Sequence, residues 1–115
     1  MSAVLRRQWK RQAYPVEFGE GEDVERFTLR SMTYGEIEEA DKLPGIERRF
    51  FQVACAMLDA GGKPELPRED GEVAEAFAAR AMEFMRDVPS DTIIALAEAA
   101  ANLRRESSVK AKAKN

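Results

Sequence analysis

The stretch IERRFFQVACAML, residues 46–58, carries the most regular pattern in the chain. Its apolar side chains recur at spacings of three and four residues, which places them on one face of a helix. These positions are Ile46, Phe50, Val53, Ala54, Met57 and Leu58. We therefore predict a helix over residues 46–58 whose apolar stripe packs against the rest of a core.

Upstream of this helix, two short segments alternate apolar and polar residues, as half-buried strands do. Tyr14 and Val16 belong to the first segment and Phe27 and Leu29 to the second, with a glycine-rich acidic stretch between them. If Val16 faces Phe27, all four apolar side chains share one face of a sheet. A slip of one residue would instead put Arg26 opposite Val16. The sequence therefore predicts a β-hairpin with a defined register.

Between the hairpin and the helix lies the sequence Thr33-Tyr34-Gly35-Glu36. The Thr33 hydroxyl can accept a hydrogen bond from the Glu36 amide while the glutamate side chain reaches back, which is a capping box. Pro44 disfavours the helical conformation of the residue before it. We therefore predict a short helix that begins after Thr33 and ends near Leu43.

Downstream, glycines and prolines interrupt all periodicity over residues 60–71, which predicts a loop. Apolar spacings of three and four then predict a helix over residues 72–87, ended by Pro89, and another over residues 90–105. Residues 107–115 hold too little apolar surface to pack, so we expect them to form a flexible basic tail.

These elements together predict an α+β protein that is mostly α. An N-terminal antiparallel β-hairpin would precede a bundle of about four helices and a flexible C-terminal tail. A chain of 115 residues supports one core. We therefore expect a single domain over residues 1–106 and a disordered basic tail over residues 107–115.

The net charge of −3 divides unevenly along the chain. Residues 1–15 and residues 104–115 each carry a net +4, which leaves −11 for the middle. The acidic middle would repel a phosphate backbone, which argues against broad nucleic-acid binding. The two basic ends remain as surfaces for RNA or for an acidic protein, or simply as solubilising segments.

Location follows from hydropathy and from cysteine use. The longest uncharged apolar stretch, near residues 92–97, is far shorter than the roughly 20 residues that cross a bilayer. No signal peptide is recognisable at the basic N-terminus. Cys55 is the single cysteine and falls within an apolar helical pattern, which indicates a buried structural thiol in a reducing compartment. We expect the cytoplasm and no membrane partner.

The sequence offers no recognisable catalytic chemistry. It contains no histidine and one cysteine, which excludes histidine-based triads, histidine zinc sites and thiolate cages. The twelve residues 59–70 match a calcium loop in length, but Pro64 stands where such a loop needs glycine. We therefore expect no enzyme activity, no cofactor, no metal and no small-molecule substrate.

Adjacent large apolar residues suggest a binding surface instead. Phe50 and Phe51 point about 100° apart on a helix, so a thin domain cannot easily bury both, and the same holds for Phe84 and Met85. Phenylalanine and methionine together form an adaptable surface for a partner's amphipathic helix. The candidate protein-binding residues are Phe50, Phe51, Met57, Met82, Phe84 and Met85. The alternative interpretation is that these residues only widen the core stripe.

The order of these parts resembles that of phage tail assembly chaperones. The resemblance runs through three segments, LRSMTYGEIEEADKL, CAMLDAGGKPEL and the closing EAAANLRRESSVKAKAKN. The matching residues are Leu29, Arg30, Met32, Thr33 and Glu36 in the first segment, Asp59, Gly62, Pro64 and Leu66 in the second, and Asn102 with Leu103 in the third. Leu66 stands where the family commonly has an aromatic residue.

The resemblance implies a chaperone of the host cytoplasm that is absent from the mature virion. Such proteins coat the long, helical tape measure protein, keep it soluble and recruit tail tube subunits around it. Self-association, as a ring or spiral around a filament, is compatible with that role. In several relatives a ribosomal frameshift near the end of the coding sequence adds a second domain.

Three other functions fit parts of the sequence. A structural virion protein, such as a tail completion or connector subunit, would also be small and acidic. A regulator would bind nucleic acid through the basic N-terminus, where Arg6, Arg7, Lys10 and Arg11 flank Trp9. An enzyme would need a metal or substrate that no motif predicts.

Overall fold

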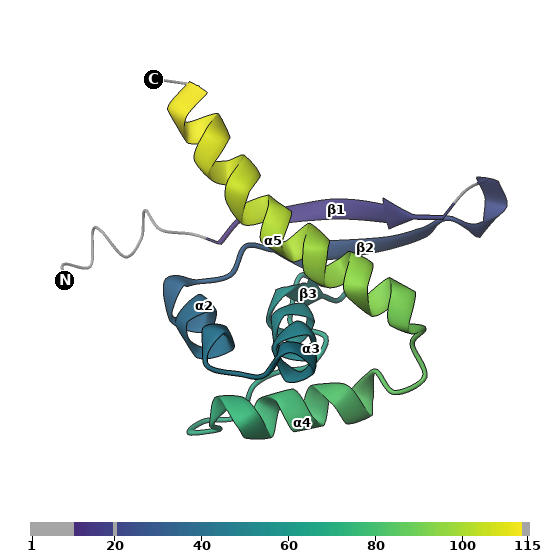
Figure 1. Ribbon diagram of the computed structural model, residues 1–115. Helices are drawn as coiled ribbons and strands as arrows, with labels where there is room; N and C mark the ends of the chain where they lie inside the picture. Colours follow the sequence, from purple (N-terminus) through teal and green to yellow (C-terminus); the bar gives the residue numbers. More distant parts are fainter. Residues whose placement is uncertain (1–10, 20, 114–115) are drawn as a thin grey trace.

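The computed structural model describes residues 11–19 and 21–113, with side chains as far as Leu103 except that of Asp23. Figure 1 shows the order of its elements, which begins with a hairpin and continues through four helices. The predicted fold class, α+β and mostly α, is confirmed. Four residues of the predicted nucleic-acid-binding N-terminus lie outside the described residues, namely Arg6, Arg7, Trp9 and Lys10.

The hairpin consists of β1 (Ala13–Phe18) and β2 (Glu25–Arg30), joined through a 3-10 turn η1 (Gly21–Asp23). Val16 pairs with Phe27 and Tyr14 pairs with Leu29, which confirms the predicted register. The apolar face fixes this register, because a slip of one residue would bury charged side chains and expose Leu29, which is fully buried in the structure.

A third strand, β3 (Met57–Leu58), pairs antiparallel with β2. The prediction that the helix extends through residue 58 is therefore wrong at its end. Helix α3 (Gly45–Ala56) stops where the backbone of Met57 turns to an extended conformation. The sheet supplies the reason, since Arg30 donates from Nε to the Cys55 carbonyl at 3.0 Å and Thr28 pairs with Leu58. These contacts give hydrogen-bond partners to backbone groups that would pair within the helix if α3 were longer.

Helix α2 (Tyr34–Asp41) begins with the predicted capping box. The Glu36 amide donates to the Thr33 hydroxyl at 3.2 Å, and the Thr33 amide donates to Glu36 Oε1 at 3.0 Å. At the other end of α2, the Arg48 guanidinium donates to the carbonyls of Ala40, Asp41 and Leu43. Because Arg48 belongs to α3, these bonds fix α2 against α3.

Helix α4 (Ala74–Phe84) is shorter than the predicted span of residues 72–87, and α5 (Ser90–Ala113) is longer than the predicted span of residues 90–105. Residues 107–113 of the predicted basic tail continue α5 as a helix, and the flexibility of that tail stays a prediction. No glycine or proline follows Glu106, and alanine and lysine favour the helical conformation. The last two residues of that predicted tail lie outside the described part.

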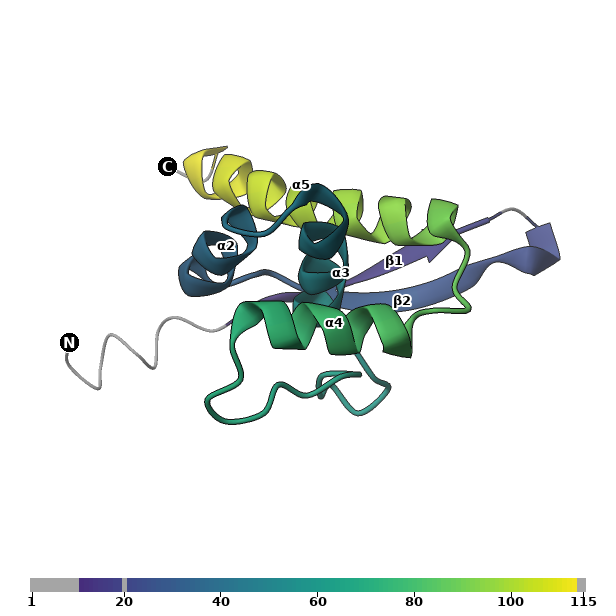
Figure 2. The same cartoon turned by 60° about the horizontal axis from the view of Figure 1, so that its bottom comes forward.

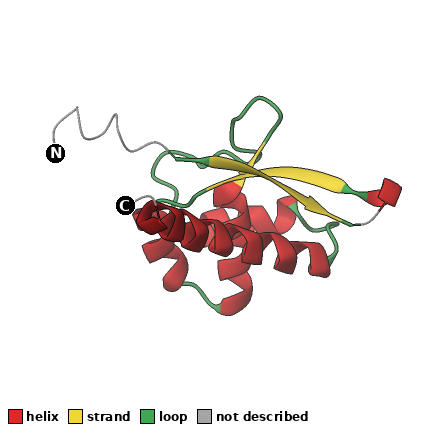
Figure 3. Cartoon of the chain, turned by 90° about the horizontal axis from the view of Figure 1, so that it is seen from above, coloured by secondary structure: helices red, strands yellow, loops and turns green. Residues whose placement is uncertain are grey.

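The molecule has two layers, with the strands lying along one side of the helices (Figure 3). Helix α3 is central because it packs against both α4 and α5, and it also contacts β2. The largest fully buried side chains are Phe51, Phe77, Leu29, Leu96 and Val53. Figures 1 and 2 show the connection between α4 and α5 on the side toward which the hairpin turn projects.

Cys55 lies in this core, as the sequence predicts, and its thiol is free. Burial raises the pKa of the Cys55 thiol, so the group stays protonated and unreactive near neutral pH. Among the helices over the described residues, none combines the length and the apolar character that crossing a bilayer requires.

Candidate protein-binding site

The six candidate residues do not share one environment. Phe51 and Met85 belong to the core, with exposed fractions of 0% and 3%. Both side chains are therefore largely covered by their neighbours, and protein binding at the six residues stays a prediction. Phe50, Met57 and Met82 are partly buried, whereas the side chain of Phe84 is 52% exposed.

The two adjacent pairs divide as helix geometry requires. Phe51 points into the core and meets Phe77 edge to face, with ring centroids 5.7 Å apart, while Phe50 lies at the core margin. Met85 turns inward just after α4 ends, and its neighbour Phe84 faces solvent. One member of each pair fills the core, and the other remains at the surface.

Three of the six candidates, Met57, Phe84 and Met85, line one surface hollow of about 430 Å³. We call this depression the Phe84 hollow. Its lining residues are Glu25, Phe27, Met57, Phe84, Met85, Asp87, Val88, Pro89, Thr92 and Leu96. They come from β2, β3, the end of α4, the α4–α5 connection and the start of α5. Phe50 and Met82 line no part of it.

Comparisons with family models, with curated proteins and with solved structures returned no match for this chain. The function of the protein is therefore argued from its own residues.

The Phe84 hollow is lined mostly by apolar side chains, and we call its two exposed carboxylates, Glu25 and Asp87, the acidic rim. Phe27 is held in place by the ring of Phe18, with centroids 5.7 Å apart. Neither carboxylate of the acidic rim forms an ion pair with any residue that the structure describes. The hollow is thus suited to an apolar side chain that has a cation beside it.

Sequence reasoning found the helical half of this site and missed the strand half. Phe27 is recognisable in the sequence as a hairpin residue, but nothing local indicates that it lies beside Phe84. Leu96 likewise reads as a core position on the last helix. Only the tertiary structure brings these side chains to the lining of one hollow.

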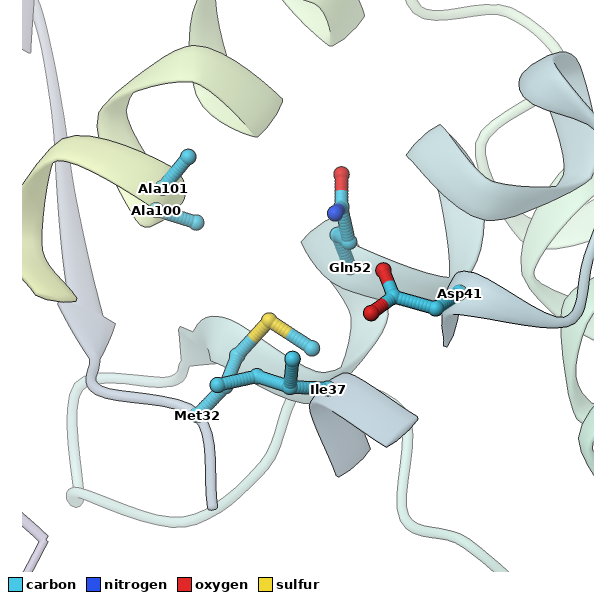
Figure 4. A pocket seen from close by; sticks show the side chains of 6 residues that line it. All are labelled: Met32, Ile37, Asp41, Gln52, Ala100 and Ala101. Carbon is cyan, nitrogen blue, oxygen red and sulfur yellow. The ribbon is translucent and has the colours of Figure 1, made fainter. Parts of the chain in front are cut away.

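A second, smaller cavity of about 80 Å³ lies between α2, α3 and α5. Figure 4 shows Asp41 and Gln52 near one another, with Met32 and Ile37 on one side and two alanines of α5 across from them. A space of this size could hold a few water molecules but not a partner's segment. Within the described residues, no group of three or more possible metal ligands gathers at this cavity or elsewhere.

Two arginines hold the loop between β3 and α4 in place. Arg68 donates to both carboxylate oxygens of Glu39, and its guanidinium lies 5.5 Å from the Phe51 ring centroid and 5.6 Å from that of Phe77. Arg80 donates twice to the Glu72 carboxylate, each time at 2.6 Å. The loop between β3 and α4 is therefore tied to α2, α3 and α4.

Acid should loosen this loop through Glu72. Hydrogen bonds from Arg80, and then one from the Glu69 amide, lower the pKa of Glu72 from 4.5 to about 2. A carboxylate with a lowered folded-state pKa stabilises the fold above its unfolded pKa and loses that contribution as pH falls. Thermal unfolding between pH 5 and pH 2 should therefore show a smaller acid-induced drop in Tm for Glu72→Gln than for the wild type. Equal drops would contradict this role of Glu72.

Proposed function

We propose that this protein is a phage tail assembly chaperone that binds an apolar segment of the tape measure protein at the Phe84 hollow. The observation that carries the proposal is the 52% exposure of Phe84 above an apolar hollow, at the meeting point of sheet and helices. An exposed aromatic beside an apolar depression is a common feature of protein-binding surfaces. The tail tube protein would be a second partner, recruited once the tape measure protein is coated.

The composition of the chain supports this role. An acidic body stays soluble at high concentration while its apolar hollow is unoccupied. The host cytoplasm is the compartment in which such a chaperone would act, and a buried, protonated Cys55 is compatible with it.

Coexpression with a long helical tape measure protein from the same genome tests the proposal. The wild-type chain should bring that protein into the soluble fraction and copurify with it, whereas Phe84→Asp should lose most of the copurified material. Ile46→Asp is the matched control, since Ile46 is 62% exposed and lies at the far end of α3 from Met57. Failure of solubilisation and copurification with the wild-type chain would refute the chaperone role.

Mass spectrometry of purified particles separates this function from that of a tail completion or connector subunit. A chaperone leaves before the virion is complete, so the protein should be present in assembling cells and absent from mature particles. Its retention at a fixed copy number in mature particles would favour the structural subunit.

A further inference from the structure

We infer that an extended, basic segment of a partner protein pairs with the free edge of β2 at Arg26 and places an apolar side chain in the Phe84 hollow. The inference rests on the proposed function only in that both require a protein partner. It adds the conformation and charge of the segment that binds, which can be tested without the tape measure protein.

The hydrogen-bond pattern of the hairpin shows which backbone groups of β2 face away from β1. The Ser31 amide donates to the Gln12 carbonyl at 2.9 Å, and these two residues lie opposite each other in the extended register. In an antiparallel pair, alternate residues exchange such bonds. Thr28 and Arg26, at odd spacing from Ser31, therefore direct their N–H and C=O groups away from β1.

The outward-facing backbone groups of Thr28 have a partner strand, whereas those of Arg26 have none among the described residues. Thr28 pairs with Leu58, which is the last residue of β3. The chain then turns, since the Gly62 amide donates to the Asp59 carbonyl at 3.0 Å. Within the described residues, no backbone hydrogen bond reaches Arg26 on that side. Arg26 thus offers one donor and one acceptor at an open edge beside a cavity of about 490 Å³.

The outer edge of β1 is less suited than that of β2 to pairing with an added strand. The same alternation directs the backbone of Pro15 outward, and proline has no N–H to donate. Proline on an edge strand is a common protection against unwanted pairing. The two edges of the hairpin therefore differ, and strand addition is favoured at Arg26.

Charge selects the kind of segment that fits. Glu25 and Asp87 on the rim of the Phe84 hollow and Glu65 at the open edge form no ion pair with any described residue. The side chain of Arg26 is neutralised by Glu17, with Nε 3.0 Å from Oε1. A second copy would bring the same acidic rim against this one, whereas lysine or arginine two residues from an apolar residue, on the same face of an extended segment, complements it.

Strand alternation connects the edge to the hollow. Residues on an added strand point alternately to the two faces of the sheet, so those on the face of Phe27 point toward the Phe84 hollow. An apolar residue there would cover the exposed ring of Phe84. A helix would satisfy its own backbone and leave the groups of Arg26 unused, which favours an extended segment.

Binding of a fluorescein-labelled nonapeptide to the full chain, measured by anisotropy, tests the inference; valine and lysine alternate along one face of this peptide, with threonine at each position between them. Replacing the lysines by glutamates, or the central threonines, whose N–H groups would pair with β2, by prolines, should each weaken binding by about tenfold or more. Phe84→Ser should weaken binding of the lysine and valine peptide to a similar degree, while Ile46→Ser should leave it unchanged. Equal affinity for the proline peptide, or for the glutamate peptide, would overturn the inference.

Sedimentation of the full chain tests the competing occupant. A concentration-dependent dimer that Phe84→Ser abolishes would show that a second copy fills the hollow, which would overturn the assignment to a basic partner segment.

The experiments distinguish a failure of the strand-addition mode from a failure of the proposed function. Copurification with the tape measure protein, but no selective peptide binding, would refute the strand-addition mode alone, whereas selective peptide binding without copurification would refute the chaperone role.

Discussion

Replacing Phe51 by alanine should lower the free energy of unfolding by about 3–5 kcal/mol. Phe51 is fully buried and packs edge to face on Phe77, so its loss removes apolar burial and leaves a cavity in the centre of the molecule. Chemical denaturation monitored by circular dichroism measures this difference. A chain of this size has few kilocalories to lose, so the variant should be close to unfolding at 37 °C.

Phe84→Ala provides the matched comparison, because the same side chain is removed from a site that is 52% exposed. We expect a loss of about 1 kcal/mol or less, since about half of the removed surface is already in contact with water. Equal destabilisation by the two substitutions would contradict the assignment of Phe51 to the core and Phe84 to the surface.

Replacing Arg68 by alanine should cost about 2 kcal/mol, the second largest effect that we expect. The side chain joins Glu39, the Glu72 carbonyl and the faces of two core rings, although it is 28% exposed and its carboxylate partner 36%. Solvent weakens the ion pair, so the stacking and the bonds to the backbone carry much of the effect. Arg68→Lys should recover little, because an ammonium group cannot bond both oxygens of Glu39 and stack at once.

Arg86→Ala controls for the loss of an arginine as such. Arg86 and Glu83 lie 3.7 Å apart on the surface, and both side chains are 75% exposed. We expect a change within about 0.5 kcal/mol. If urea denaturation showed the same loss for Arg86→Ala and Arg68→Ala, the anchoring role of Arg68 would be wrong.

Local patterns account for the elements that the sequence predicts well. The register of the hairpin follows from alternation alone, because one slip exchanges its apolar and charged faces. The capping box at Thr33 and Glu36 is likewise a contact across three residues. Each of these features depends on side chains that are close in the sequence.

The residue at which a helix ends, and the strand with which another strand pairs, depend on residues that are distant in the sequence. Met57 and Leu58 continue the helical spacing of the residues before them, yet they form β3 because Thr28 and Leu29 offer backbone partners there. Helix α5 passes its predicted end because nothing in its sequence stops it. Of the six candidate residues, Phe84 is exposed whereas Phe51 and Met85 are buried, since periodicity does not say which neighbour covers each face. Protein binding at these residues stays a prediction.

The sequence by itself determined the order of the elements, the hairpin register and the start of the first helix, because these follow from alternation, spacing and capping within a few residues. Tertiary structure alone decided that β3 exists, that Arg26 is left at an open edge and that Phe27, Phe84 and Leu96 line one hollow. The physical reason is that burial and strand pairing are set by contacts between segments far apart in the chain, where each side chain's environment depends on what packs against it.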